Sequence, residues 1–116
     1  MKRQVIAYGN YYNELLMTLN EKEILKLKYI LSLLETRDRM PVKFMKLIRN
    51  ELYELRMSYE RNSYRIFFIF DEGKIVVLFN WFQKKTEKTP RKEIDKAMKI
   101  KNEYYEYKKQ HDNEHQ

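Results

Sequence analysis

Apolar residues recur with two different periods along the chain, and each period predicts a different kind of element. Between residues 20 and 36 they follow the three- and four-residue spacing of a helix face. Asn20 and Glu23 have the spacing of a capping box, so we expect Asn20 to be the N-cap of this helix. The apolar face carries Ile24, Leu27, Leu31 and Leu34.

Three other segments are predicted to be helical. Residues 11–19 form the first, after a break at Gly9-Asn10, and Met40-Pro41 starts a short second one, because proline is tolerated in a first helical turn. One face of that short helix would carry Lys43, Lys46 and Arg49. The last helix begins at Thr89-Pro90, with Thr89 as its N-cap. Its buried stripe consists of Ile94, Ala97, Met98 and Tyr105.

Four segments have the composition and length of strands, namely residues 5–8, 52–58, 64–70 and 75–82. The last two are apolar on both faces, so we expect them at the centre of a sheet. The turn between them contains Gly73, which suits the positive φ of a hairpin. The chain therefore runs strand, helices, three antiparallel strands and helix, and this order indicates an α+β fold.

The positive charge of the chain is unevenly distributed. Lys and Arg number 24 against 17 Asp and Glu, for a net charge of +7. Residues 84–101 carry eight basic and three acidic side chains, and residues 37–65 carry eight and four. Such clustering favours an anionic partner, namely nucleic acid, an acidic protein or a membrane surface. The 17 aromatic residues, ten of them Tyr, provide faces on which bases can stack.

Length and composition predict one domain over residues 1–108, followed by a polar tail, residues 109–116, that frays. The chain has no cysteine, which excludes disulfides and thiolate metal sites. Residues 1–8 contain no long apolar stretch, and no segment has the roughly 18 apolar residues of a spanning helix. We therefore expect a cytoplasmic protein with no membrane partner.

Arg65 lies within the apolar strand predicted for residues 64–70. Burying an unpaired guanidinium is costly, so Arg65 has to reach a partner or an open groove. It can form an ion pair with Glu54, or it can bind two phosphate oxygens at once. Arg56, in the neighbouring strand, can supply a second cation to the same face or form an ion pair of its own.

Three lysines, Lys84, Lys85 and Lys88, follow the strand at residues 75–82. They can neutralise RNA phosphates, or they can belong to a solvated loop that keeps the protein soluble. A lysine on the scissile phosphate would also stabilise charge in the transition state. Lys84 is the best candidate for this role, because it shares strand parity with Phe82.

Other kinds of chemistry have little support. The two histidines, His111 and His115, lie in the predicted tail, so the core has no histidine acid–base pair. Their spacing suits metal ligands, but a single pair in a tail is weak, and we predict neither a metal nor another cofactor. Arg, Lys and Tyr remain, and they fit cleavage in which the RNA 2′-hydroxyl attacks its own neighbouring phosphate.

The candidate catalytic residues are therefore Arg65 and Lys84. The candidate RNA-binding residues are Arg56, Lys85, Lys88 and Trp81. For Trp81 two interpretations stay open, base stacking and core packing, because neighbouring strand residues face opposite sides of a sheet.

Several motifs recur with the order and spacing of a known family. They are the run from Lys46 to Arg56 with its Leu-Tyr-Glu-Leu-Arg end, then Tyr64-Arg65-Ile66-Phe67-Phe68, then Ile75-Val76-Val77-Leu78, then the run from Phe82 to Pro90, then Glu93-Ile94 with Ala97. Together, over residues 20–107, they resemble the phage-derived, HigB-like branch of the RelE toxin superfamily. In that family, basic residues on the RNA-facing surface match Arg56, Arg65, Lys84 and Lys85.

The resemblance implies a small twisted antiparallel sheet of about four strands, with N-terminal helices packed on one face and a C-terminal helix. It implies a type II toxin that cleaves mRNA on the ribosome, a metal-independent endoribonuclease that contacts mRNA and rRNA. It also implies a co-encoded helix-turn-helix, HigA-like antitoxin. Two positions depart from the pattern: Asn50 stands where many relatives have Gly, and Asn80 stands where many have His.

Two alternative functions remain open. A ParE-type toxin that poisons gyrase shares the fold and has no nuclease chemistry. A non-catalytic module that binds RNA or the ribosome would keep the charge and the aromatic residues without an acid or base. Asn80 supports this second alternative, because an amide cannot carry a proton. Asn50 is compatible with the family fold, because Asn tolerates the positive φ of the turn that Gly would form.

Overall fold

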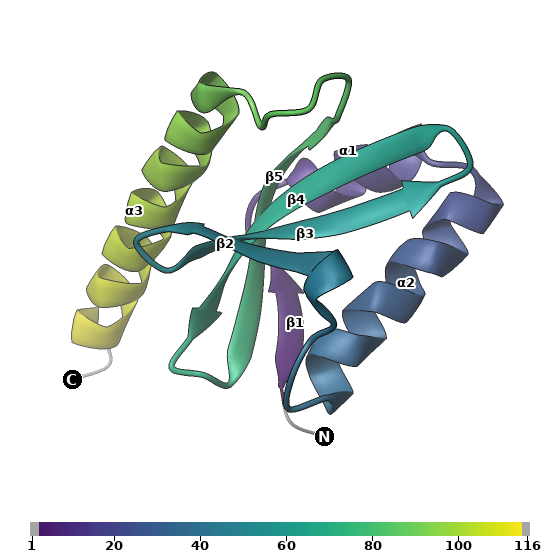
Figure 1. Cartoon of the computed structure of the whole chain (residues 1–116). Coiled ribbons are helices and arrows are strands. Elements are labelled where there is room, and N and C mark those ends of the chain that lie inside the picture. Colours follow the sequence, from purple (N-terminus) through teal and green to yellow (C-terminus); the bar gives the residue numbers. More distant parts are fainter. Residues whose placement is uncertain (1–2, 115–116) are drawn as a thin grey trace.

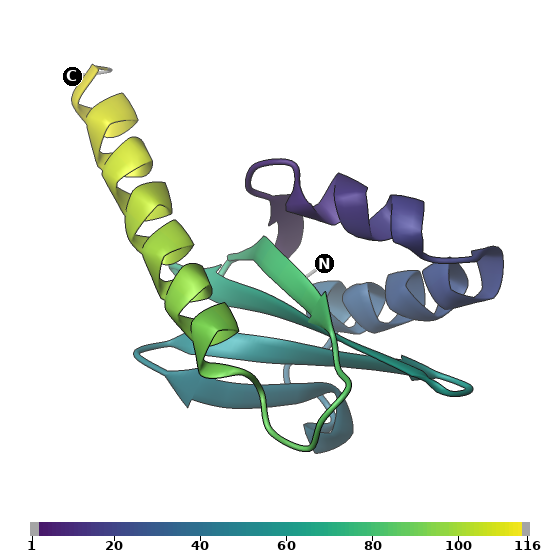
Figure 2. The same ribbon diagram turned by 90° about the horizontal axis from the view of Figure 1, so that it is seen from above.

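A five-stranded sheet lies between two helical layers in the computed structural model, which describes residues 3–114 (Figures 1 and 2). The elements are β1 (Gln4–Ala7), α1 (Tyr11–Thr18), α2 (Glu21–Thr36), the 3-10 turn η1 (Val42–Phe44), β2 (Met45–Arg49), β3 (Leu52–Tyr59), β4 (Asn62–Asp71), β5 (Ile75–Gln83) and α3 (Arg91–Glu114). The strand order is β1-β5-β4-β3-β2, and β1 runs parallel to β5 while the other pairs are antiparallel. This arrangement confirms the predicted α+β class.

Helices cover the two faces of the sheet unequally. Figure 2 shows α1 and α2 on one side and α3 on the other. The first layer buries Leu15, Leu27, Ile30 and Leu34 against Leu55 and Phe68. The second buries Ala97, Ile100 and Tyr104 against Phe67, Val77 and Phe79. The central strands β4 and β5 are therefore apolar on both faces, as their sequences predicted.

The helix predicted to start at Met40-Pro41 is wrong. The chain forms the short turn η1 and then strand β2, which pairs antiparallel with β3 from Met45 opposite Leu55. Asn50 and Glu51 connect the two strands with φ of 47° and 65°, so Asn50 does take the positive φ expected of it. This tight connection extends the sheet by one strand, because pairing with β3 satisfies the backbone that a helix would otherwise satisfy internally.

The predicted start of α2 is confirmed, whereas both predicted ends of α3 are wrong. The capping box of α2 is present: Glu23 N donates to Asn20 Oδ1 over 2.8 Å, and Asn20 N donates to Glu23 Oε1 over 2.9 Å. Thr89 is not the N-cap of α3, because the helix begins at Arg91 and the carbonyl of Pro90 accepts the first helical bond, 3.0 Å from Glu93 N. At its other end α3 continues through residues 109–114, which the sequence placed in a frayed tail.

Buried positions on α3 differ in part from the predicted stripe. Ala97 is buried and Ile94, Met98 and Tyr105 pack at the edge of the core, whereas Ile100 and Tyr104 are buried without having been predicted. Tyr104 is held by a polar contact, since its hydroxyl donates to the buried carboxylate of Asp71 over 2.5 Å. Lys108 also reaches Asp71, at 2.9 Å, so α3 is anchored to the end of β4. In the described part of the chain, no helix is both long and apolar enough to cross a membrane.

The capping box gives a prediction about stability. Asn20→Ala removes the side chain that accepts from Glu23 N, so we expect the free energy of unfolding to fall by about 1 kcal/mol. Urea titration followed by circular dichroism measures the change. Lys22→Ala, an exposed position in the same first turn, should stay within about 0.5 kcal/mol of wild type. Equal losses in the two variants would show that the box contributes nothing.

Candidate functional site

Four cations gather on the α3 side of the sheet, beyond the area that α3 covers. We call Lys46 of β2, Arg56 of β3, Arg65 of β4 and Lys84 after β5 the cationic face. Lys46 pairs with Glu54 across β2 and β3, and Arg56 stands directly opposite Arg65 across β3 and β4. Opposed like charges destabilise a sheet, so this pairing needs a compensating anion.

Glu54 is that anion, and it is buried with an exposed fraction of 1%. Its Oε1 lies 2.7 Å from Arg65 Nε and 3.6 Å from Arg56 Nε, while its Oε2 accepts a hydrogen bond from the Thr89 hydroxyl over 2.9 Å. Glu54 Oε1 forms no hydrogen bond with either Nε atom, so both contacts are ion pairs. One carboxylate thus joins β3, β4 and the segment that precedes α3.

Arg65 is therefore a member of an ion pair, the first of the two roles that its sequence allowed. It is buried, with an exposed fraction of 8%, and its Nη1 donates to the carbonyl of Tyr64 over 3.1 Å. Burial lowers the pKa of the Arg65 guanidinium, and the charge of Glu54 opposes that effect. The role of a phosphate clamp stays a prediction, and the guanidinium still lines an open hollow of the surface.

Lys84 occupies the position between two hollows of the surface. Its backbone N–H donates to the carbonyl of Ser63 over 2.7 Å, which holds the chain beside β4 just after β5 ends. Partial burial and the charge of Arg65 lower the pKa of the Lys84 amine, with smaller contributions from Arg56 and Lys46, and Glu54 opposes them. A lysine in such surroundings can exchange protons more readily than a solvated one.

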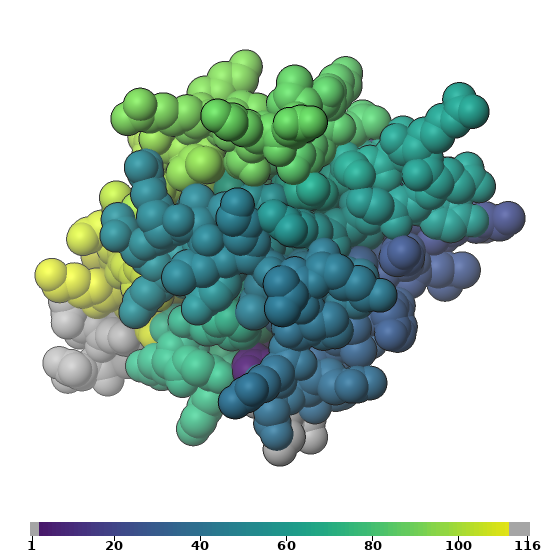
Figure 3. Space-filling model, viewed as in Figure 1, coloured from purple at the N-terminus to yellow at the C-terminus, as the bar shows by residue number. Residues whose placement is uncertain are grey.

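The two hollows meet at Lys84 and are both rich in basic side chains. The first, between β2 and the start of α3, is lined by Lys46, Arg56, Lys84, Lys88, Thr89 and Ile94 among others. The second, at the β3–β4 hairpin, is lined by Arg61, Ser63, Arg65, Gln83, Lys84 and Lys85 among others. Figure 3 shows the surface on which β2, the β3–β4 hairpin and the segment before α3 come together. The structure thus brings five of the six predicted site residues to one surface.

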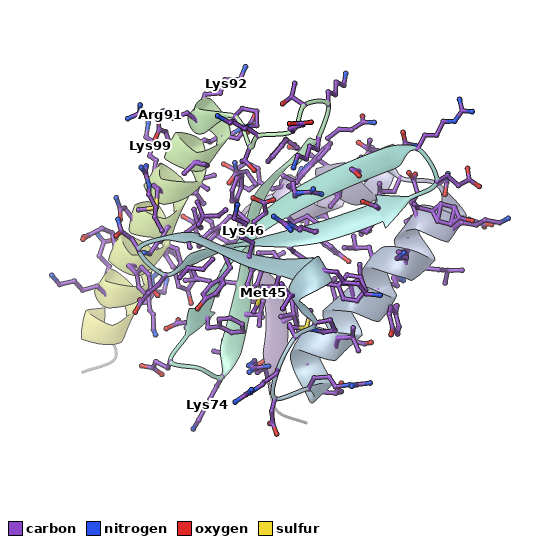
Figure 4. The ribbon with its side chains drawn as sticks, viewed as in Figure 1. Met45, Lys46, Lys74, Arg91, Lys92 and Lys99 are labelled. Carbon is purple, nitrogen blue, oxygen red and sulfur yellow. The ribbon has the colours of Figure 1, made fainter. Side chains whose placement is uncertain are left out.

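Sequence reasoning missed Lys46, Arg61, Thr89 and the central position of Glu54. Lys46 was predicted on a helix; in Figure 4 it projects from β2, whereas Arg91, Lys92 and Lys99 project outward from α3. A period of two over residues 45–49 would have been the signal, but the buried–exposed alternation of this edge strand is incomplete. Thr89 was missed because Thr89-Pro90 is a helix-start pattern, which gave no sign that the Thr89 hydroxyl bonds to Glu54.

Trp81, the sixth predicted residue, lies on the opposite face. It pairs with Ile66 and packs into the α1–α2 core, with its ring centroid 6.4 Å from that of Tyr64. Between the pair of Trp81 with Ile66 and the pair of Leu78 with Phe68, two residues of β5, Phe79 and Asn80, stand opposite the single residue Phe67. This irregularity is a β-bulge. Asn80 is buried, and its amide donates to the carbonyl of Glu93 over 3.3 Å, so its side chain is held against the first turn of α3.

His111, the histidine that the structure describes, is not part of this surface. His111 lies on α3, where its Nδ1 is 3.1 Å from the carbonyl of Tyr107, and His115 lies outside the described residues. Over residues 3–111, whose side chains the structure describes, no three His, Cys, Asp or Glu side chains are grouped so that they could hold a metal ion. The chemistry that the described site offers is that of guanidinium, amine, carboxylate and hydroxyl groups.

Comparison with known proteins identifies a family. The family model described as phage-derived protein Gp49-like (DUF891) matches residues 14–102, which include every residue of the cationic face. No curated protein matches the chain.

The buried ion pair gives a prediction about stability. Arg65→Met keeps most of the side-chain length but leaves Glu54 buried beside a single, more distant cation, Arg56. We expect the free energy of unfolding to fall by about 3–5 kcal/mol in urea titrations. Lys85→Met, which removes an exposed charge, should change it by less than about 0.5 kcal/mol. Wild-type stability in Arg65→Met would mean that this ion pair does not support the fold.

Proposed function

The chain belongs to the phage-derived Gp49-like family, which is associated with RelE-like toxins of toxin–antitoxin systems, and we propose that it is a type II toxin that cleaves mRNA on the ribosome. The observation that carries the proposal is the cationic face. Arg56 and Arg65 share one buried carboxylate, and Lys46 and Lys84 line the neighbouring hollows, so the surface keeps an excess of positive charge. An excess of this kind is costly for folding and suits a phosphate-rich substrate.

The proposed reaction needs no metal or other cofactor. The RNA 2′-hydroxyl oxygen forms a bond to the adjacent phosphorus, and the bond from phosphorus to the 5′-oxygen breaks. The products are a 2′,3′-cyclic phosphate and a 5′-hydroxyl. Lys84, as the neutral amine, accepts the proton of the 2′-hydroxyl, and water supplies the proton that the leaving oxygen needs. Arg65, with Arg56 beside it, stabilises the negative charge that grows on the phosphate oxygens.

Docking and chemistry are assigned to different residues. Lys85 and Lys88 are exposed on the segment between β5 and α3, where they can bind mRNA or rRNA phosphates without entering the hollows deeply. A co-encoded helix-turn-helix, HigA-like antitoxin would neutralise the toxin. Trp81 is left out of this assignment because its ring packs on the other face of the sheet.

A second candidate function is binding of RNA or ribosomes without cleavage. The specific observation in its favour is Asn80, which replaces the histidine of many relatives with a buried amide. Because that amide cannot carry a proton, the proton carrier of this chain has to come from the cationic face itself, where the pKa of the Lys84 amine is lowered.

Expression of the wild-type chain alone in bacteria should stop growth and protein synthesis. Incorporation of labelled methionine should fall before incorporation of labelled thymidine, because mRNA cleavage stops translation directly. Co-expression of the helix-turn-helix protein from a neighbouring reading frame should restore both growth and synthesis. Early loss of thymidine incorporation with continuing translation would point instead to the gyrase-poisoning alternative, and normal growth at high soluble expression would contradict the toxin assignment.

Lys84 and Lys85 are adjacent and should affect different steps. Lys84→Met should lower the single-turnover rate of cleavage of ribosome-bound mRNA by about a hundredfold or more, because it removes the proton acceptor. Lys85→Met should leave that rate intact and reduce the slope of log affinity against log salt by about one, because it removes one phosphate contact.

The pH dependence of the same rate tests the form of Lys84. The neutral amine is the reactive form, so the rate should rise with pH and level off below the ordinary lysine pKa of about 10.5, since the pKa of Lys84 is lowered. The rise should be absent in Lys84→Met. A rate that falls with rising pH over this range would show that the ammonium form is required and would refute the base assignment.

A further inference from the structure

Three separate segments of the chain depend on one buried carboxylate for their relative position. Glu54 contacts Arg56 on its own strand, Arg65 on β4 and Thr89 before α3. Glu54 has an exposed fraction of 1%, so water cannot replace any of these partners easily. A contact of this kind is worth more than a surface contact, because electrostatic attraction is stronger in the low-dielectric interior than in water.

The segment of residues 84–90 has few other side-chain links to the sheet. The Thr86 hydroxyl bonds to the carbonyl of Lys88 inside the segment, and Lys84 N bonds to the carbonyl of Ser63 at its start. Residues 85–88 are exposed. Among the described residues, the hydrogen bond from Thr89 to Glu54 is the one that links a side chain of this segment to a strand. It closes the segment at the end away from Ser63.

We propose that Glu54 and Thr89 are positioning residues, which hold the segment of residues 84–90 so that the Lys84 amine stays beside the guanidinium groups of Arg56 and Arg65. Neither residue needs to touch the substrate, since both act through the cations. The proposal deepens the nuclease assignment and rests on it for the part that concerns cleavage. Independently of cleavage, the contact between Thr89 and Glu54 sets the surroundings of the Lys84 amine.

Geometry explains why such a contact matters for the chemistry. The proposed acceptor is Lys84 and the proposed charge stabilisers are the two arginines, so one substrate phosphate has to meet groups from three segments. Misplacement of one group by about 1 Å can lower an enzymatic rate by about a hundredfold. A bond that closes the segment restricts that movement directly, whereas the exposed side chains of residues 85–88 do not.

Glu54 also acts on Lys84 by its charge. Lys84 faces Arg65 from β4, Arg56 and Glu54 from β3 and Lys46 from β2, with Arg61 of the hairpin and Lys85, Glu87 and Lys88 of its own segment nearby. Among the groups that shift its titration, Glu54 is the one that favours the ammonium form. Glu54→Gln keeps the size of the side chain and removes this charge, so the pKa of Lys84 should fall further below its ordinary value.

The test separates the hydroxyl from the rest of the Thr89 side chain. Thr89→Val keeps the shape and removes the donor, and it should lower the single-turnover cleavage rate of ribosome-bound mRNA by about tenfold to a hundredfold, with little change in affinity. Thr89→Ser keeps the donor and should recover most of the rate. Thr36→Val removes a hydroxyl bond of similar length, 2.8 Å to Ser32 O, on α2, and it should behave as wild type. Equal rates in Thr89→Val and Thr36→Val would overturn the proposal.

A second measurement does not depend on cleavage. Lysine side-chain NMR on the purified protein gives the pKa of Lys84 directly, with Lys84→Arg to assign the signal. In Glu54→Gln the pKa of Lys84 should fall, and in Thr89→Val the Lys84 signal should move while that of Lys28 on α2 should not. An unchanged Lys84 signal in both variants would refute the positioning role.

The two measurements also distinguish this proposal from the proposed function. If the wild-type chain cleaves no RNA but Lys84 responds as expected, the nuclease assignment fails and the positioning role stands. If the wild-type chain cleaves RNA and neither variant changes the rate or Lys84, the nuclease assignment stands and the positioning role fails. Should Glu54→Gln not fold, Thr89→Val still decides, because it leaves all the charges in place.

Discussion

The ion pairs of the buried Glu54 are the interaction on which the candidate site depends. Two arginines stand opposite each other in adjacent strands, a pairing that a sheet tolerates only with a nearby anion. Glu54 supplies that anion and also ties down the segment before α3 through Thr89. A buried ion pair adds little net stability compared with apolar residues of the same size. Its presence in the sheet is better explained by the arrangement of cations that it maintains.

Much of the architecture could be predicted, because it follows from local periodicity. The apolar runs of β4 and β5 indicated central strands, and the spacing of Asn20 and Glu23 indicated the start of α2. The segment at residues 40–49 could not be predicted in the same way. Its apolar residues fit a helix as well as an edge strand, and the choice depends on pairing with β3, which is a tertiary contact. The same limit hid β1 as the parallel neighbour of β5.

The sequence allowed us to predict which charged residues form the candidate site, but not how their side chains are arranged. The density of Lys and Arg near residue 84 identified Lys84, Lys85 and Lys88, and these lie with Arg56 and Arg65 on one surface. Strand parity alone could not decide the side for Trp81, since both faces of β5 are covered and a bulge at Phe79 and Asn80 changes the count. Thr89 shows the limit clearly: Thr-Pro is a common helix start, yet its hydroxyl bonds to a strand 35 residues earlier.

The parallel pairing of β1 with β5 has a consequence for the order in which the protein can be completed during synthesis. Gln4 pairs with Ile75, so β1 leaves the ribosome well before its partner, which follows about seventy residues later. Lys84 and Thr89 follow that partner, and α3, which covers the second face, comes last. A nascent chain therefore has no assembled cationic face until the residues up to Thr89 have been translated. The catalytic surface proposed for this protein would come into existence only after strands far apart in the sequence have been translated and paired.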